Sequence, residues 1–304
     1  MVYDLIIIGG GPAGITAGIY AARKKLKTLL ITKDWGGQIV KANEIENWPG
    51  VKKISGMDLM KNMTEHLKQF ELEIKQNREV INLEKKGDNF SVRDSEEEYE
   101  AKSVIIATGK VPRTLNIPGE EKFKGKGVSI CSTCDAPMFK DKDVAIVGGG
   151  NAGFGVAMDM IKYANKVYIL EFFPETKGDI ITKEKLAQSG KVEFITNIAV
   201  KEIKGDKFVE SLIYEDRKTS KDTEIQVKGV FISVGMAAKV DFAEKLVELN
   251  NIGEIVIDKD NYTKTPGIFA AGDITDIKYE QITIACGEGA KAVLAATDYL
   301  KSGS

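Results

Sequence analysis

Two cysteines stand three positions apart, at Cys131 and Cys134, and Asp135 follows them directly. Two thiols at this spacing can form a small reactive disulfide, and an adjacent carboxylic acid can move the proton that thiol exchange requires. The alternatives are two buried cysteines or half of a zinc site. Zinc needs four ligands, and only Cys286 and the single histidine, His66, could add to the pair. The pattern therefore favours redox chemistry without a metal.

Two glycine-rich turns indicate dinucleotide binding. Residues Gly9–Gly14 read GGGPAG, and residues Gly148–Gly153 read GGGNAG. Each turn follows a β-branched run and opens an amphipathic helical pattern. In that context the glycines permit a tight turn and a close backbone approach, and the helix N-terminus faces a pyrophosphate. The alternative for each turn is a purely structural connection between a strand and a helix.

An acidic residue that could bind a ribose follows only the second turn. Glu171 ends the next apolar run, 21 residues beyond Gly150. A carboxylate at that place accepts hydrogen bonds from the 2′-hydroxyl of an adenosine ribose and repels a 2′-phosphate. The alternative is a solvated carboxylate at a strand end. The equivalent place after the first turn reads ITKD over Ile31–Asp34, without an acid at the strand end.

The two glycine turns belong to an imperfect internal repeat, residues 3–31 and 143–171. Each copy is followed by short strand patterns and a buried apolar run, which favours an α/β fold of two Rossmann-like, three-layer ββα dinucleotide-binding domains. We expect one domain, formed by residues 1–113 and 242–304, to be interrupted by a second, residues 114–241. The expected strands and the closing helix are Val80–Leu83, Phe90–Arg93, Tyr99–Lys102, Ser103–Thr108, Val200–Ile203, Val209–Tyr214, Glu224–Val227, Gly229–Val234, Glu254–Asp258, Ile268–Ala271 and the helix Gln281–Leu300.

Composition limits the classes of protein that the chain can represent. It has 304 residues, 43% hydrophobic, with a formal net charge of −2 and no basic cluster that predicts binding to nucleic acid or to a membrane. The N-terminal apolar run lacks the features of a signal peptide, so a cytoplasmic protein is expected. Cys286 lies in an apolar helical stretch and is expected to be a small buried side chain. His66 is expected at the surface of a helix.

The ordered set of motifs resembles the low-molecular-weight thioredoxin reductase family over essentially the whole chain. The resemblance rests on both glycine turns, on GGQ at 36–38, ENWPG at 46–50, ATG at 107–109, CSTCD at 131–135 and GD at 272–273. It implies an FAD domain split around a nicotinamide domain that carries the two cysteines. It places FAD at Gly9, Gly11, Pro12, Ala13, Gly14, Gly36, Gly37, Gln38, Asn47, Thr108, Gly109, Gly272, Asp273 and Gln281. The nicotinamide nucleotide is expected at Gly148, Gly150, Asn151, Gly153 and Glu171.

The second domain departs from the usual pattern of that family. The family carries a basic HRRxxxR segment for the 2′-phosphate of NADPH, but residues 171–177 read EFFPETK. This segment is similar to the flavoprotein subunit of alkyl hydroperoxide reductase, a relative that uses NADH. That subunit has an additional N-terminal thioredoxin-like domain, whereas this chain starts with the FAD motif, so a separate acceptor protein is expected. Two other family features, a Glu after the second turn and a Pro-Asn pair, are replaced by Gly155 and by Ala237-Ala238.

The resemblance implies electron flow from NAD(P)H, with NADH favoured, through FAD to the disulfide and then to thioredoxin or a thioredoxin/glutaredoxin-like protein. In the family Cys134 faces the flavin, Cys131 exchanges with the partner, Asp135 acts as acid and base, and the enzyme is a homodimer. The inserted domain rotates, with hinges expected near Leu115–Gly119 and Gly235–Asp241. Three alternatives remain: a reductase that uses ferredoxin or another donor in place of the nicotinamide, the reductase component of a peroxiredoxin system, or a flavin-bearing binding or sensor protein without turnover.

Overall fold

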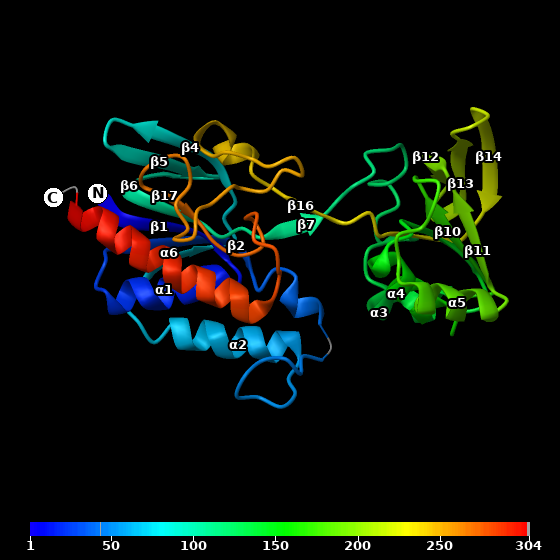
Figure 1. Cartoon of the computed structure of the whole chain (residues 1–304), viewed down its shortest axis with the longest axis horizontal. Coiled ribbons are helices and arrows are strands. Elements are labelled where there is room, and N and C mark those ends of the chain that lie inside the picture. Colours follow the sequence, from blue (N-terminus) through cyan, green and yellow to red (C-terminus); the bar gives the residue numbers. More distant parts are fainter. Residues whose placement is uncertain (43, 303–304) are drawn as a thin grey trace. The chain divides into compact units, whose positions relative to one another are not determined.

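The computed structural model describes residues 1–42 and 44–302, apart from the side chains of Thr133 and Cys134. The chain divides into a first unit, Met1–Val111 with Ala237–Ser304, and a second unit, Pro112–Met236 (Figure 1). The chain returns to the first unit earlier than the expected boundary at residue 242. The reason is that Val240 and Ala243 are buried in the core of the first unit, so this stretch packs there and does not act as a free linker.

The first unit is built on a seven-stranded sheet. Its strands run in the order β3 (Glu73–Gln76), β2 (Thr28–Trp35), β1 (Val2–Gly10), β6 (Glu98–Ile106), β5 (Asn89–Asp94) and β4 (Val80–Lys86), and β17 (Ile268–Ala270) also pairs with β6. The pairs among β3, β2, β1, β6 and β17 are parallel, while β4, β5 and the start of β6 are antiparallel. The parallel part brings the carboxyl ends of β1 and β6 to the same edge.

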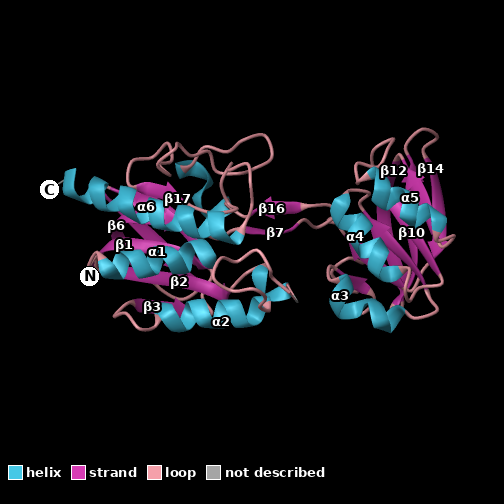
Figure 2. Cartoon of the chain, turned by 60° about the horizontal axis from the view of Figure 1, so that its bottom comes forward, coloured by secondary structure: helices cyan, strands magenta, loops and turns pink. Residues whose placement is uncertain are grey.

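Both faces of this sheet are covered, which explains the continuous apolar runs in its strands. Leu5 and Ile7 of β1 face a core shared with α1 (Pro12–Arg23), α2 (Gly56–Leu67) and α6 (Ile282–Ser302). Ile6 and Ile8 face the opposite core, which includes the antiparallel strands and η3 (Asp241–Leu246). Figure 2 shows the three helices together on one face of the strands. A 3₁₀ turn, η1 (Ile39–Lys41), precedes α2.

Three predicted strands differ from the structure. Tyr99–Lys102 and residues 103–106 of the predicted Ser103–Thr108 are parts of the single strand β6, which pairs with β5 near its start and with β17 near its end. Glu254–Asp258 forms no strand, since only Ile255 makes isolated bridges there.

The turn between β5 and β6 is closed by Asp94, whose buried carboxylate accepts hydrogen bonds from the amides of Glu96 and Glu97, each over 2.7 Å.

The second unit repeats this plan on a smaller scale. Its parallel sheet has the order β11 (Val192–Thr196), β10 (Lys166–Glu171), β9 (Asp143–Val147), β15 (Gly229–Ile232) and β8 (Val128–Ser129). One face packs against η2 (Ala136–Phe139), α4 (Asn151–Met160) and α5 (Ile180–Gln188), with the short α3 (Ser132–Asp135) beside α4. The other face packs against a separate antiparallel sheet of β12 (Ile198–Gly205), β13 (Val209–Asp216) and β14 (Lys221–Gln226).

The chain passes between the units through two short paired strands, β7 (Lys110–Pro112) and β16 (Met236–Ala238). The segment after β7 belongs to the second unit, because Leu115 and Ile117 pack against its core and Pro118 accepts a hydrogen bond from Ile203. The two hinges, near Leu115–Gly119 and Gly235–Asp241, remain predictions. None of the described helices is long and apolar enough to cross a membrane.

Candidate functional site

A cavity of about 650 Å³ opens in the first unit at the carboxyl ends of β1 and β6. Most residues predicted to hold FAD line it: Gly9, Gly11, Pro12, Ala13, Gly36, Gly37, Gln38, Thr108, Gly109, Gly272, Asp273 and Gln281. Asn47 does not line it but donates a hydrogen bond to Gln281 Oε1 over 3.1 Å. The cavity also includes residues that the sequence did not single out, among them Lys110 and Glu280.

The first glycine turn is shaped by close contacts that exclude a side chain. Gly9 has a φ of +121°, and a Cβ atom there would lie 2.3 Å from the carbonyl oxygen of Ala107. A Cβ on Gly14 would lie 2.0 Å from the carbonyl oxygen of Gly9, so this glycine lets α1 pack against the turn. The N-terminus of α1 has no side-chain cap and lines the cavity. Its free amides and the helix dipole suit a pyrophosphate.

The surroundings of Asp273 indicate whether the cavity fits a flavin nucleotide. Its Oδ1 atom is buried and has no hydrogen-bond partner among the described residues. Burial raises the pKa of this carboxyl group, Glu280 adds to the rise and Lys110 opposes it. A buried oxygen without a partner is costly unless a ligand supplies one. A polyhydroxyl chain such as the ribityl group of FAD supplies donors of this kind, so the residues present fit the cofactor.

The second glycine turn repeats the geometry of the first. Gly148 has a φ of +111°, and its Cβ would lie 2.3 Å from the carbonyl oxygen of Ser233. A Cβ on Gly153 would lie 1.9 Å from the carbonyl oxygen of Gly148. Helix α4 also starts without a side-chain cap, at Gly150. Its first residue, Asn151, accepts a hydrogen bond from the amide of Asp179 over 2.7 Å.

Glu171 lies next to this turn and is only 7% exposed. The amide of Gly149 donates to its Oε2 over 2.6 Å, and the amide of Phe173 donates to its Oε1 over 2.9 Å. Glu171 is therefore not a solvated strand-end carboxylate. Each of its oxygens has one lone pair left for a further donor, such as a ribose hydroxyl.

Two residues beside Glu171 were missed by the sequence reasoning. The Oγ1 atom of Thr176 is buried without a hydrogen-bond partner among the described residues. Arg217, which follows β13, stacks its guanidinium 3.8 Å from the centre of the Phe172 ring and donates to the Phe172 carbonyl oxygen. Arg217 lies 46 positions beyond Glu171, so no local motif could have revealed it.

The cysteine motif lies between β8 and α4. Cys131 is half-buried and disulfide-bonded, whereas the side chain of Cys134 lies outside the described part of the structure. Asp135 Oδ2 accepts a hydrogen bond from Ser129 Oγ over 2.6 Å, and Ser129 Oγ accepts one from the amide of Cys131 over 3.0 Å. Ser132 donates to Asp159 of α4 over 2.9 Å, which fixes the motif to that helix. The sequence reasoning did not identify Ser129 or Asp159.

The other two candidates lie apart from this motif. Cys286 is a free, partly buried thiol of α6, and burial raises its pKa. Its Sγ atom lies 3.8 Å from the carbonyl oxygen of Pro12. His66 is exposed near the end of α2 and lies beside Phe70, as expected of a surface residue. No cluster of potential metal ligands occurs among the residues that the structure describes.

Residues 3–289 match the family model described as pyridine nucleotide-disulphide oxidoreductase. The chain belongs to this family. Its fold agrees with a solved member: the crystal structure of thioredoxin reductase from Lactococcus lactis is 36% identical, with 99% of each chain covered and a TM-score of 0.84. The predicted α/β fold of two Rossmann-like domains, the FAD-dependent oxidoreductase class and the cofactors FAD and NAD(P)H are confirmed.

Relatives in this pyridine nucleotide-disulphide oxidoreductase family carry different names. The chain is 41% identical over 299 residues to a protein named NADH dehydrogenase from Bacillus subtilis. It is 40% identical over 299 residues to a Staphylococcus epidermidis protein that is named as a subunit of alkyl hydroperoxide reductase. These matches cover 98% of this chain but only 58% and 59% of the two relatives. The chain thus shares its family with relatives that carry different names.

Proposed function

We propose that this protein is an NADH-preferring disulfide reductase that delivers electrons to thioredoxin or to a thioredoxin/glutaredoxin-like protein. The observation that carries this proposal is the disulfide-bonded Cys131 with Asp135 held beside it, in one chain with two nucleotide-binding turns. When bound, FAD supplies two-electron transfer between the nicotinamide nucleotide and the disulfide. Residues of the chain bind the nucleotide and carry out the thiol exchange.

The preference for NADH rests on the surroundings of the second glycine turn. The Glu171 carboxylate lies beside the turn, fixed by two backbone amides, where it can accept from ribose hydroxyls. A 2′-phosphate would meet this negative charge. Arg217 is engaged in stacking on Phe172, and Lys177 lies 4.2 Å from the centre of the Phe173 ring, so both cations are already packed against aromatic rings.

The redox role rests on Cys131, Cys134 and Asp135. One thiolate of the reduced pair attacks the partner's disulfide and forms a mixed disulfide, and the second thiolate then displaces the reduced partner. Asp135 is proposed to supply and remove the protons, and Ser129 orients it through their 2.6 Å hydrogen bond. In this assignment Cys131 exchanges with the partner and Cys134 faces the flavin.

Anaerobic titration tests the donor and the acceptor separately. NADH and NADPH are added in parallel to the FAD-loaded protein, and the flavin absorbance is followed. We expect NADH to bleach the flavin at lower concentration than NADPH, and thioredoxin to be reduced only when both cysteines are present. If neither nucleotide bleached the flavin, the nicotinamide-dependent proposal would be refuted, and ferredoxin or another donor would be tested next.

A second candidate is the reductase component of a peroxiredoxin system. It is favoured by the 40% identity to the hydroperoxide reductase relative over nearly all of this chain, although the chain spans only 59% of that relative. The two candidates differ in the acceptor. Reconstitution with NADH and a peroxiredoxin, with no thioredoxin added, would give peroxide-dependent NADH oxidation only in the second case. We further propose a cytoplasmic homodimer, to be checked by cell fractionation and light scattering.

A further inference from the structure

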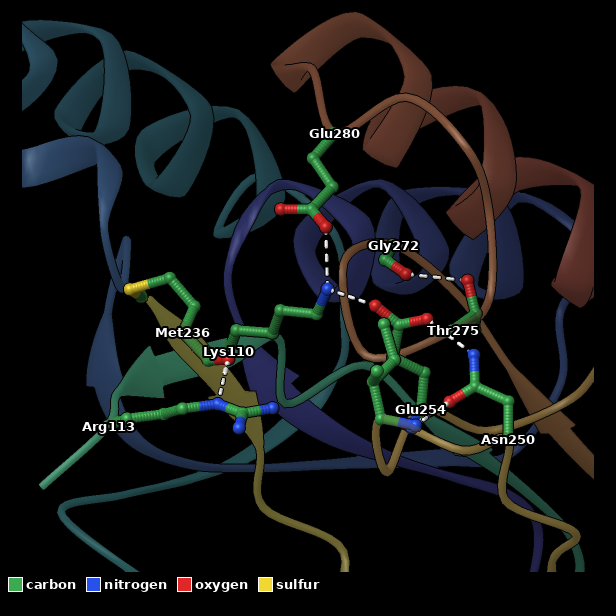
Figure 3. Close-up of polar contacts among 9 residues, drawn as sticks. Lys110, Arg113, Met236, Asn250, Glu254, Gly272, Thr275 and Glu280 are labelled. Atoms are coloured by element: carbon green, nitrogen blue, oxygen red, sulfur yellow. Dashed lines mark hydrogen bonds and ion pairs between the residues drawn. The ribbon is translucent and has the colours of Figure 1, made fainter. Parts of the chain in front are cut away.

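Lys110 lies where the chain leaves the first unit, and it is a buried cation in the wall of the flavin cavity. Its side chain is 9% exposed, and its Nζ atom lies 2.5 Å from Glu254 Oε1 and 2.5 Å from Glu280 Oε1. Figure 3 shows the ammonium group between the two carboxylates. None of the three residues belongs to a glycine turn or to the cysteine motif.

Lys110 and Glu254 are held in place by further contacts. Glu254 is 10% exposed, and its Oε2 accepts a hydrogen bond from Asn250 Nδ2 over 2.7 Å. The backbone carbonyl of Lys110 accepts a hydrogen bond from Gln38 Nε2 over 3.3 Å. Burial by itself would lower the pKa of Lys110, but the two carboxylates outweigh this effect and raise it. Lys110 is therefore a permanent positive charge over the working pH range.

The cluster is coupled electrostatically to the cavity. Lys110 and Glu280 both line it, and Glu280 directly precedes Gln281 at the entry to α6. Asp273 lines the same cavity, and Lys110 lowers and Glu280 raises the pKa of its buried carboxyl group. Lys110 and Glu254 are buried, and charges in such a setting interact more strongly than in water.

We propose that the Lys110–Glu254–Glu280 cluster sets the reduction potential of the bound flavin. Two-electron reduction at neutral pH adds two electrons and one proton to the flavin ring, which thereby gains one negative charge. A nearby cation favours the reduced form and nearby carboxylates oppose it, since protein charges tune the cofactor's electronics. Lys110 is thus a positioning and tuning residue for the cofactor. This proposal rests on FAD occupying the cavity.

The experiment measures the flavin midpoint potential of the FAD-loaded protein by dye equilibration. Lys110→Met should disfavour reduction about tenfold, and Glu280→Gln should favour it about tenfold, shifts of about 30 mV in opposite directions for a two-electron couple. Lys110→Arg should stay within threefold of the wild type. The double variant Lys110→Met/Glu280→Gln restores the net charge of the cluster and should return toward the wild-type potential.

The matched control is Lys102→Met. Lys102 also pairs with a carboxylate of the first unit, Asp4, over 2.9 Å, but it does not line the cavity. It should leave the potential unchanged. If Lys110→Met does not retain FAD, the potential of Glu280→Gln tests the proposal by itself. Glu280 is 42% exposed, so its substitution is compatible with folding.

Three outcomes would overturn the proposal: shifts of the two single variants in the same direction, shifts below threefold in both, or a loss of FAD affinity without a change in potential. These outcomes are independent of the proposed function. The wild-type titration with NADH judges the donor, whereas only differences between variants in potential judge Lys110.

Discussion

Ser129 Oγ lies 2.6 Å from Asp135 Oδ2, and the amide of Cys131 donates a hydrogen bond to the same Oγ over 3.0 Å. A hydroxyl has one proton to donate, and the shorter contact indicates that the carboxylate accepts it. The buried Ser129 therefore connects the proposed acid to the backbone of the redox motif. A serine at the end of β8 thus controls where Asp135 points.

Ser129→Ala should lower disulfide turnover about tenfold, because loss of this hydrogen bond costs about 1–1.5 kcal/mol of positioning. Reduction of the flavin by NADH should stay unchanged, since it does not use Asp135. Both rates are measured by stopped flow on the same preparation. Ser129→Thr keeps the hydroxyl and should recover most of the loss, whereas equal losses in both variants would contradict the role.

Asp135→Asn should lower turnover with thioredoxin by about 10²- to 10⁴-fold, the usual contribution of a general acid or base. The half-reaction with NADH should again be unaffected. Asp143→Asn is the control, because Asp143 lies in the same unit and bonds only to Asn165 among the side-chain contacts found for it. Wild-type turnover in Asp135→Asn would remove Asp135 from the mechanism.

Glu171→Ala should reduce the ratio of kcat/KM for NADH over NADPH at least tenfold. The carboxylate that we propose to accept from the ribose is lost, and so is the charge that would repel a 2′-phosphate. Steady-state kinetics with both nucleotides measure this ratio. Glu193→Ala, which removes an exposed partner of Lys166 in the same sheet, is the control. An equal loss with both nucleotides would assign Glu171 to loop structure alone.

Two glycines of α4 should respond in opposite ways to alanine. Gly153→Ala places a Cβ 1.9 Å from the Gly148 carbonyl and should destabilise the second unit by about 1–3 kcal/mol or more. Gly155 has open space around its Cβ position, and Gly155→Ala should stabilise the helix by about 0.5–1 kcal/mol. Urea unfolding measures both. A destabilised Gly155→Ala would contradict the open space found at this position.

Asp94→Asn should cost about 1–3 kcal/mol of stability at pH 7. Burial alone would raise the pKa of Asp94, but the amides of Glu97 and Glu96 outweigh this and hold it below its usual value. A lowered folded-state pKa stabilises above the unfolded pKa, and the stabilisation is lost as pH falls through the folded pKa. The difference from wild type should therefore shrink below about pH 4. Urea unfolding at pH 7 and below pH 4 checks this, with the exposed Asp88→Asn as control.

The features that could be predicted from sequence are those encoded locally. The geometry of the two glycine turns can be predicted from their residues, because Gly9 and Gly148 have a positive φ that other residues rarely adopt. The internal repeat, residues 3–31 and 143–171, then predicted the α/β fold of two domains. The expected strand at Glu254–Asp258 failed because Glu254 turns inward to meet Lys110, a partner 144 positions away, so its apolar neighbours do not form a ladder.

Two of the residues that sequence reasoning missed, Lys110 and Arg217, act through distant partners. Lys110 reads as a solvated cation until Glu280, 170 positions away, is brought beside it. Arg217 acquires its place only when the end of β13 reaches Phe172. Ser129 is close to Asp135 in sequence, but serine is too common for its hydrogen bond to be inferred. Tertiary contact, rather than local pattern, defines these positions.

The first unit is completed only by β17 and α6, which follow the entire second unit in the chain. During synthesis, residues 112–236 emerge as one block and can close their own sheet early. Asp273, Gln281 and the helix that packs on α1 come later, and residues 237–302 need roughly 3–13 seconds of translation. FAD can therefore be captured only after β17 and α6 have been synthesised, at a stage when the second unit can already have closed its own sheet.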